Sequence, residues 1–267
     1  MRKPHHSHNF YALLRTMAAV VAISHAPGAW AQSSSNLIIG VPQQMSVGHS
    51  ELADMRQDAW AQLPQDVQVI SADSAAAMQR SQCKITGPSG TQPYPSGNRT
   101  PAGNVVLRMK FTQPDAAPEV EVLYSARHHL LAKTGVSLAQ QYRMHCEKPL
   151  AGPVYATQTV RLRTEGAKGA ALKDMAFVPF LQSLDRASLG KVKFDLNTMS
   201  CPFDVKVTVI EPFAENTIAE AEARDPNRQE FLAWLRKLVF KYPAQTERFL
   251  VGESTKVTVP CMVLDFT

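Results

Sequence analysis

The sequence predicts an α+β fold in which two small antiparallel sheets each pack against one helix, in the order ββαβ. Runs such as Val105–Phe111 alternate apolar and polar residues with the period of a half-buried strand. Arg228–Phe240 instead carries its apolar residues at helical spacing. The same order of patterns occurs twice along the chain, which indicates an internal repeat.

The first module is expected over residues 104–165. Strands are predicted at Val105–Phe111 and Val120–Tyr124, with a proline-containing turn between them. A helix near Val136–Met144 and a closing strand at Tyr155–Leu162 follow. Such a sheet buries one face against its helix and leaves the other face polar.

The second module is expected over residues 172–267, where the same order follows a linking helix. Its predicted elements are a linking helix at Leu172–Leu189, a hairpin of Lys191–Leu196 and Val205–Ile210, a helix at Arg228–Phe240 and a long closing strand at Thr255–Phe266. The acidic stretch Glu211–Asn227 is an insertion in this copy, and we expect an exposed loop or helix there.

Residues 32–100 form an N-terminal segment that is poor in predicted helix and strand. The clearest patterns are a short strand at Leu37–Val41 and a helix near Ser50–Leu63. Gly87–Gly97 is dense in glycine and proline, and we expect a loop there.

Residues 1–31 have the order of parts of a secretory signal peptide. Three basic residues and no acidic residue occur in this stretch, and the last of them, Arg15, precedes a short apolar run. Pro27 and Gly28 follow, and then the small-x-small sequence Ala29-Trp30-Ala31. We therefore predict cleavage after Ala31 and a periplasmic location. An uncleaved anchor is the alternative, but the apolar run is shorter than the roughly 20 residues of a membrane helix.

The charge excess of the chain lies mostly in this predicted leader. The whole chain has 28 Lys and Arg against 23 Asp and Glu, a net charge of +5. Cleavage removes three of the basic residues and leaves 25 against 23. The remaining basic residues are scattered, whereas nucleic-acid binding requires a clustered basic face. We therefore expect that the chain does not bind nucleic acid. Once the leader is removed, we also expect that the chain is not an integral membrane protein.

Four cysteines, Cys83, Cys146, Cys201 and Cys261, lie after the predicted leader. An even number of cysteines in an exported chain favours disulfides. Of the three possible pairings, Cys83–Cys146 with Cys201–Cys261 closes two loops of similar length, and the repeat supports it. Zinc binding is the alternative, but no C-x-x-C and no Cys/His spacing typical of a zinc site occurs.

The second module resembles the C-terminal domain of TonB-type energy transducers. The residues that carry the resemblance are the Val192–Leu196 and Val205–Ile210 hairpin, the helix end Trp234–Phe240, the pair Tyr242-Pro243, and the final strand Val257–Phe266. The first module is similar in a weaker form, with Tyr142 and Pro149 where the aromatic residue and the proline stand. The resemblance implies a sheet-and-helix module with an edge strand that binds peptides.

Two features of that family are missing from this sequence. Energy transducers of this type keep an uncleaved N-terminal anchor, followed by a long proline-rich segment. Here the N-terminal pattern predicts cleavage, and no such linker occurs. We therefore expect a non-catalytic, TonB-like protein of the periplasm that binds another envelope protein or assists envelope assembly, rather than one that transmits force.

The alternative function is that of a secreted enzyme using His128, His129 or His145 for acid–base catalysis. No catalytic motif supports it, since the sequence has no G-x-G-x-x-G, no Walker loop and no G-x-S-x-G. These histidines also lack the H-E-x-x-H or Cys/His spacing of a metal site. We therefore assign no catalytic residue, no metal ligand and no cofactor from the sequence.

Overall fold

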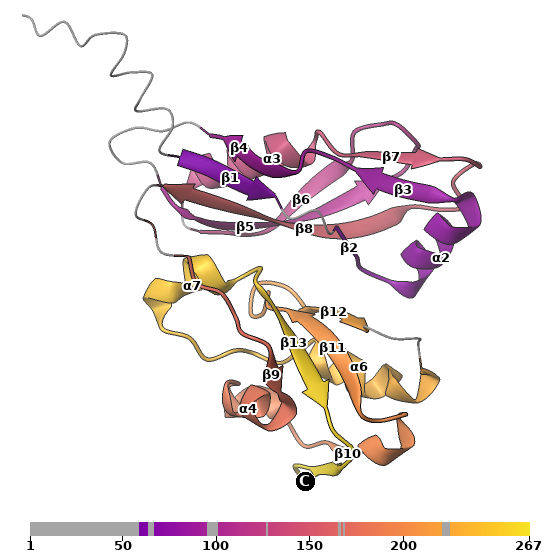
Figure 1. The fold of residues 1–267 in the computed structure, drawn as a ribbon, viewed down its shortest axis with the longest axis vertical. Coiled ribbons are helices and arrows are strands. Elements are labelled where there is room, and N and C mark those ends of the chain that lie inside the picture. The colour runs from indigo at the N-terminus through magenta and orange to yellow at the C-terminus, as the bar shows by residue number, and fades with distance from the viewer. Residues whose placement is uncertain are drawn as a thin grey trace, which may run out of the picture. The chain divides into compact units, whose positions relative to one another are not determined.

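The larger sheet of the protein combines strands from the first module and from the N-terminal segment (Figure 1). The computed structural model describes residues 59–63, 67–94, 101–126, 128–164, 167, 169–220 and 225–267. The strand order is β4-β1-β8-β5-β6, and β2 also pairs with β8. The bounds are β1 Ala59–Leu63, β2 Gln68–Val69, β4 Gly90–Pro93, β5 Gly103–Phe111, β6 Glu119–Ser125 and β8 Val154–Thr164.

The predicted helix near Ser50–Leu63 is wrong where the structure describes it. Residues 59–63 form β1 between β4 and β8, with Ala59, Ala61 and Leu63 buried. This alternation is the pattern of a strand with one buried face. Gly90–Pro93, predicted as part of a loop, forms the partner strand β4. The predicted leader and the Leu37–Val41 strand lie outside the described residues.

Helix α3 (His129–Ala139) packs on the apolar face of this sheet. The buried residues on this face of β5 are Val105, Leu107, Met109 and Phe111. The approach is close at Gly135, where an added Cβ would lie 2.9 Å from Cγ1 of Val105. This packing confirms the predicted sheet-and-helix arrangement of the first module. The helix itself lies earlier than the predicted Val136–Met144, and Arg143 and Met144 belong to a strand instead.

A two-stranded sheet and a helix complete this part of the fold. Strand β3 (Cys83–Thr86) pairs with β7 (Arg143–Cys146), and Cys83 lies directly opposite Cys146 in the register. Helix α2 (Ala72–Ser81) precedes β3 and is capped by Ser71, whose hydroxyl accepts a hydrogen bond from the backbone N–H of Ser74.

The second sheet has the order β12-β11-β13-β9. Its strands are β9 Met175–Ala176, β11 Phe203–Thr208, β12 Thr217–Glu220 and β13 Ser254–Val259. Helices α4 (Phe177–Gln182) and α6 (Gln229–Leu235) cover its apolar face, and Phe177, Phe203 and Phe231 meet in that core. Residues 172–189, predicted as one linking helix, instead contain β9, α4 and α5 (Arg186–Leu189).

The predicted hairpin of Lys191–Leu196 with Val205–Ile210 does not form. The first of these segments gives β10 (Lys193–Asp195), which pairs with β14 (Val263–Asp265) in a separate ribbon. The 3-10 helix η1 (Leu196–Thr198) follows β10. The observed hairpin is β11 with β12, so part of the Glu211–Asn227 insertion is a strand and the exposed-loop prediction is wrong there.

The two larger sheets nevertheless share one ββαβ topology. In each, a hairpin is followed by a helix and by a third strand that pairs antiparallel with the first strand of the hairpin. The spatial orders are β6-β5-β8 and β12-β11-β13. The α+β class with two sheet-and-helix modules is therefore confirmed, with β11 rather than β10 as the first strand of the second copy.

The helix predicted at Arg228–Phe240 is shorter in the structure, where α6 spans Gln229–Leu235. Helix α6 ends at Leu235, after which the N–H groups of Lys237 and Leu238 bond three residues back, to Trp234 and Leu235. Phe240 then bridges to Leu184. A further helix, α7 (Ala244–Leu250), follows Pro243 and precedes β13. All of the described residues belong to one compact unit.

Candidate functional site

Two adjoining cavities, of about 400 and 230 Å³, lie along strand β12. They share five lining residues, which are Ile70, Ser71, Ala72, Gln229 and Arg236. We call the combined cavity the β12 groove. Its walls are residues 69–73, residues 215–220, and the α6 residues Gln229, Leu232 and Arg236, with Arg108, Leu123 and Thr157 from the first sheet at one end.

The groove follows the edge of β12 rather than one of its faces. Ile218, Ala219 and Glu220 all line it. Consecutive strand residues point to opposite faces of a sheet, so a cavity that touches all three lies beside the strand. Strand β12 is at the end of the strand order, and within the described residues no other strand pairs with its outer side. The backbone at this edge is open to the groove.

Asn216 fixes the chain where it enters β12. Its side chain is buried, and its Oδ1 accepts hydrogen bonds from the N–H groups of Ile210 (2.7 Å) and Glu211 (3.1 Å). Its Nδ2 donates to the carbonyl of Leu238 at 2.7 Å, beyond the end of α6. One amide side chain therefore joins the two ends of the Glu211–Glu215 turn to the C-terminal end of α6.

The α6 wall presents a mixed surface to the groove. Gln229, Leu232 and Arg236 are three and four residues apart, so they lie on one face of the helix and its C-terminal turn. Arg236 is half-buried and lines both cavities. Within the described residues its guanidinium makes no ion pair, although its backbone carbonyl accepts from the N–H of Asn216 at 2.9 Å.

The opposite wall, residues 69–73, is held by hydrogen bonds to both sheets. The N–H of Ile70 donates to the carbonyl of Tyr155 at 3.1 Å. The hydroxyl of Thr208 on β11 donates to Oε1 of Gln68 at 2.9 Å. Since Ser71 then caps α2, the path of this wall is determined at both ends.

Acidic groups gather at one end of the groove. Asp73 and Glu215 line the larger cavity. Burial, together with the charge of Glu215, raises the pKa of the Glu211 carboxyl above its usual value. Glu220 lies at the other end, but its carboxylate is already paired with Arg228 at 3.3 Å.

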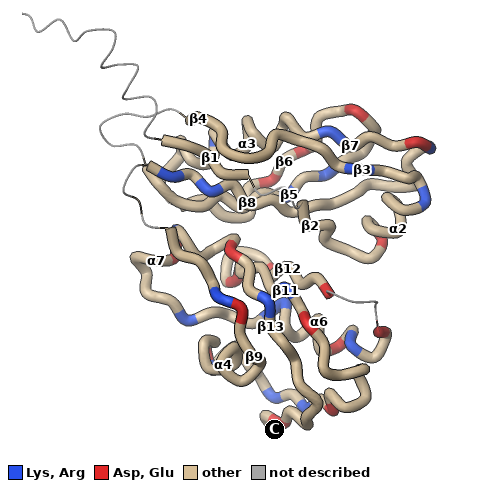
Figure 2. Tube along the Cα trace, in the orientation of Figure 1, with Lys and Arg blue, Asp and Glu red and all other residues tan. Residues whose placement is uncertain are grey.

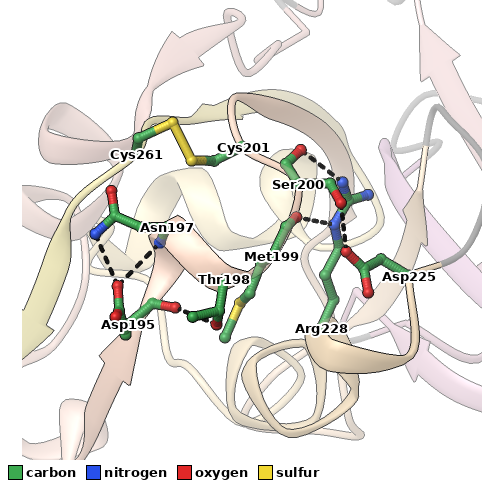
Figure 3. Close-up of a disulfide and its surroundings, with 9 residues drawn as sticks. All are labelled: Asp195, Asn197, Thr198, Met199, Ser200, Cys201, Asp225, Arg228 and Cys261. Carbon is green, nitrogen blue, oxygen red and sulfur yellow. Dashed lines mark hydrogen bonds between the residues drawn. A yellow bond between two sulfur atoms is a disulfide. The ribbon is translucent and has the colours of Figure 1, made fainter.

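Arg228 holds the end of β12 through its ion pair with Glu220. Figure 3 shows its guanidinium beside Met199 and Ser200. Arg228 is 2% exposed and is the last residue of the 3-10 helix η2 (Pro226–Arg228). Its guanidinium donates to the carbonyls of Met199 (2.8 Å) and Ser200 (3.0 Å) and stacks over the ring of Phe203.

The four cysteines form the two disulfides that the repeat favoured. Cys83–Cys146 joins β3 to β7, and Cys201–Cys261 joins the loop beside Arg228 to the chain after β13. Asp225, near the second disulfide, accepts from the Ser200 hydroxyl at 2.8 Å (Figure 3). The hydrogen bond from the Asn227 N–H, together with the one from Ser200, lowers the pKa of the Asp225 carboxyl.

A buried polar network joins the first sheet to the loop before β13. Glu253 accepts from Nε of Arg161 at 2.6 Å, from Nη2 of Arg161 at 2.8 Å and from Asn104 at 3.1 Å. Arg163 donates to Oδ1 of Asn104 at 2.8 Å, and burial lowers the pKa of its guanidinium while Glu253 opposes this shift. Gly252, at φ +89°, donates to the carbonyl of Val209 at 2.6 Å.

The three candidate histidines do not form one site. His128 is the N-cap of α3, where its Nδ1 accepts from the N–H of Leu130 at 3.2 Å. Its ring stacks on His129 at 4.8 Å between centroids. His145 lies on β7 and pairs with Asp115 instead. The three rings are exposed, and His128 and His129 lie on an element separate from His145.

A cavity of about 390 Å³ lies beside His128, between α3 and α7. In its lining, Glu247 accepts a hydrogen bond from the Tyr124 hydroxyl at 3.2 Å, and Arg248 stacks over the ring of Phe249. No group of three or more metal-binding side chains is found in the part of the chain that the structure describes.

Both of the larger sheets carry Lys and Arg as well as Asp and Glu (Figure 2). Among the described residues, no helix is long and apolar enough to cross a membrane. Comparisons with protein-family models, with curated proteins and with solved structures return no match.

The groove residues carry few signals in the sequence. Asn216, Arg236 and the edge strand β12 fall where the sequence predicts an exposed insertion or a continuous helix. The Thr217-Ile-Ala-Glu220 run is too short and too mixed to read as a strand from periodicity. Asp225-Pro226 is a helix-start pattern, and the predicted helix at Arg228–Phe240 begins just after it, but nothing similar marks the start of β12.

Proposed function

We propose that this chain is an exported, non-catalytic protein whose β12 groove binds an extended peptide of another envelope protein by strand addition. The observation that carries the proposal is the groove along the open edge of β12. An extended peptide there would pair with the backbone of β12 and place its side chains against Leu232 and Ile218.

The walls of the groove favour binding because they are already fixed. Asn216, Ser71 and Arg228 each hold a wall segment through hydrogen bonds within the protein. A preformed site loses less conformational entropy on binding than a loop that must first become ordered. The open edge would otherwise be exposed to unwanted strand pairing, which folded proteins usually prevent.

The family resemblance supports the same role. The β11-β12-α6-β13 unit keeps the sheet-and-helix composition that the TonB-type resemblance implies, although its hairpin is built from different strands than the resemblance suggested. A partner in the cell envelope fits the predicted leader and the two disulfides, since disulfides persist in oxidising compartments.

Export predicts that the chain is processed. When the full-length protein is expressed with its own N-terminus in a bacterial host, the mature product is expected to begin at Gln32. N-terminal sequencing and intact mass of the periplasmic fraction measure this. If the protein is found only in the membrane or cytoplasmic fraction and still begins at residue 1, export with cleavage is contradicted. If the periplasmic protein begins at another residue near the end of the leader, export is supported but cleavage after Ala31 is wrong.

Filling the groove is expected to weaken peptide binding. Ala72 is exposed at the first turn of α2 and lines both cavities. In Ala72→Trp the indole would occupy the shared part of the groove, and we expect at least about a tenfold rise in Kd. The probe is a fluorescent peptide selected on the wild-type protein from a random display library, with binding measured by anisotropy.

The matched control is Ala233→Trp, at an exposed position of α6 that does not line the groove. It should bind the peptide as the wild type does. Equal affinity of wild type and Ala72→Trp, or a selection that yields no peptide, would refute the proposed function.

A further inference from the structure

We infer that the β12 groove selects an extended peptide with a single acidic side chain, which pairs with Arg236. This inference rests on the proposed function and names the chemical class of its partner. It depends on where Arg236 lies and on the charges around it.

Among the described residues that line the groove, Arg236 lines both cavities and has no ion pair. It therefore faces the point at which they join. Among the described residues it makes no ion pair, whereas Arg108 pairs with Glu121 at 3.0 Å and Arg228 with Glu220 at 3.3 Å. A half-buried guanidinium without a counter-ion gains most from a carboxylate brought by the ligand, because that bond is charge-assisted.

The position favours an internal acidic side chain over a C-terminal carboxylate. The groove continues along β12 on both sides of Arg236, to Glu215 in one direction and to Glu220 in the other. A peptide that ended at Arg236 would leave half of this edge unpaired. A chain that passes through can pair with the backbone on both sides.

The neighbouring negative charges favour a peptide with only one acidic residue. Asp73 and Glu215 line the larger cavity, and neither makes an ion pair within the described residues. A run of acidic residues would place further carboxylates beside them, which costs binding energy. A lone glutamate or aspartate therefore fits better than an acidic stretch.

The test uses extended peptides of one scaffold with Glu, Gln, Lys or three consecutive Glu at the centre. For the wild-type protein we expect the single-Glu peptide to bind about tenfold more tightly than the Gln peptide, and the triple-Glu peptide to lose affinity again. Arg236→Gln should abolish the preference for Glu, and Arg236→Glu should prefer the Lys peptide. The Asn216 contact uses the backbone of residue 236, so it remains in both variants.

Lys237→Gln is the control, because it removes the same charge at an exposed position outside the groove. It should keep the preference for Glu. Equal binding of the Glu and Gln peptides to the wild type would overturn the role of Arg236 while leaving the proposed function intact. If no peptide of the panel binds, the proposed function itself fails.

Discussion

Replacing Glu253 by alanine is expected to lower the free energy of unfolding by about 3–5 kcal/mol. The carboxylate is 7% exposed and accepts two hydrogen bonds from Arg161 and one from Asn104. Arg163, also 7% exposed, lies 3.9 Å away. Among the described residues, no other carboxylate forms an ion pair with Arg161 or Arg163. Urea denaturation followed by tryptophan fluorescence measures the loss.

Glu119→Ala is the control for this prediction. Its carboxylate pairs with Lys110 at 3.0 Å on the same sheet but is 65% exposed. An exposed pair contributes about 0–1 kcal/mol, so this variant should unfold almost as the wild type does. Equal losses in the two variants would show that the Glu253 network does not hold the loop before β13 on the first sheet.

Replacing Arg228 by alanine should have an effect of similar size, about 3–5 kcal/mol. The change removes two hydrogen bonds to backbone carbonyls, the stacking on Phe203 and the counter-ion of Glu220, whose side chain is 10% exposed. Glu220 would remain as a nearly buried, unpaired carboxylate at the base of β12. The measurement is again the midpoint and slope of urea unfolding.

Arg186→Ala serves as its control, since Arg186 is exposed on α5 and makes no ion pair within the described residues. We expect a change within about 0.5 kcal/mol. If Arg228→Ala lowers the free energy of unfolding by no more than this, water replaces the hydrogen bonds from Arg228 to Met199 and Ser200 without loss of stability. The proposed role of Arg228 in holding β12 would then be incorrect.

Long strands with clear alternation were predictable, whereas pairing was not. Val105–Phe111 and Tyr155–Leu162 were placed within two residues of β5 and β8 because residues of different polarity alternate along most of each strand. The pairing of β10 depends on β14, which lies far away in the sequence. Local periodicity carries no information on such contacts, so it favoured the nearer strand as the partner.

Strand β12 and the early end of α6 were not predicted, for a related reason. Strand β12 has four residues, and its partner β11 and the Asn216 contacts stabilise it rather than its own propensity. Helix α6 ends early because the chain tightens at Lys237 and Leu238, although the apolar spacing continues to Phe240. Tertiary contacts overrode the local pattern in both places, and the groove lies between them.

Cysteine pairing was accessible from the sequence because the repeat constrained it. The two disulfides close loops of similar length, Cys83–Cys146 with a separation of 63 residues and Cys201–Cys261 with 60. The histidines gave the opposite outcome: their proximity in sequence suggested a site, but His145 lies on a different element from His128 and His129.

Hydrogen exchange of the backbone amides, with and without the selected peptide, tests the central claim most directly. Strand addition predicts slower exchange at residues 217–220 of β12, with no comparable change at β9, the opposite edge of the same sheet. Bound peptide that leaves β12 exchange unchanged, or that protects the cavity beside His128 instead, would contradict binding in the β12 groove.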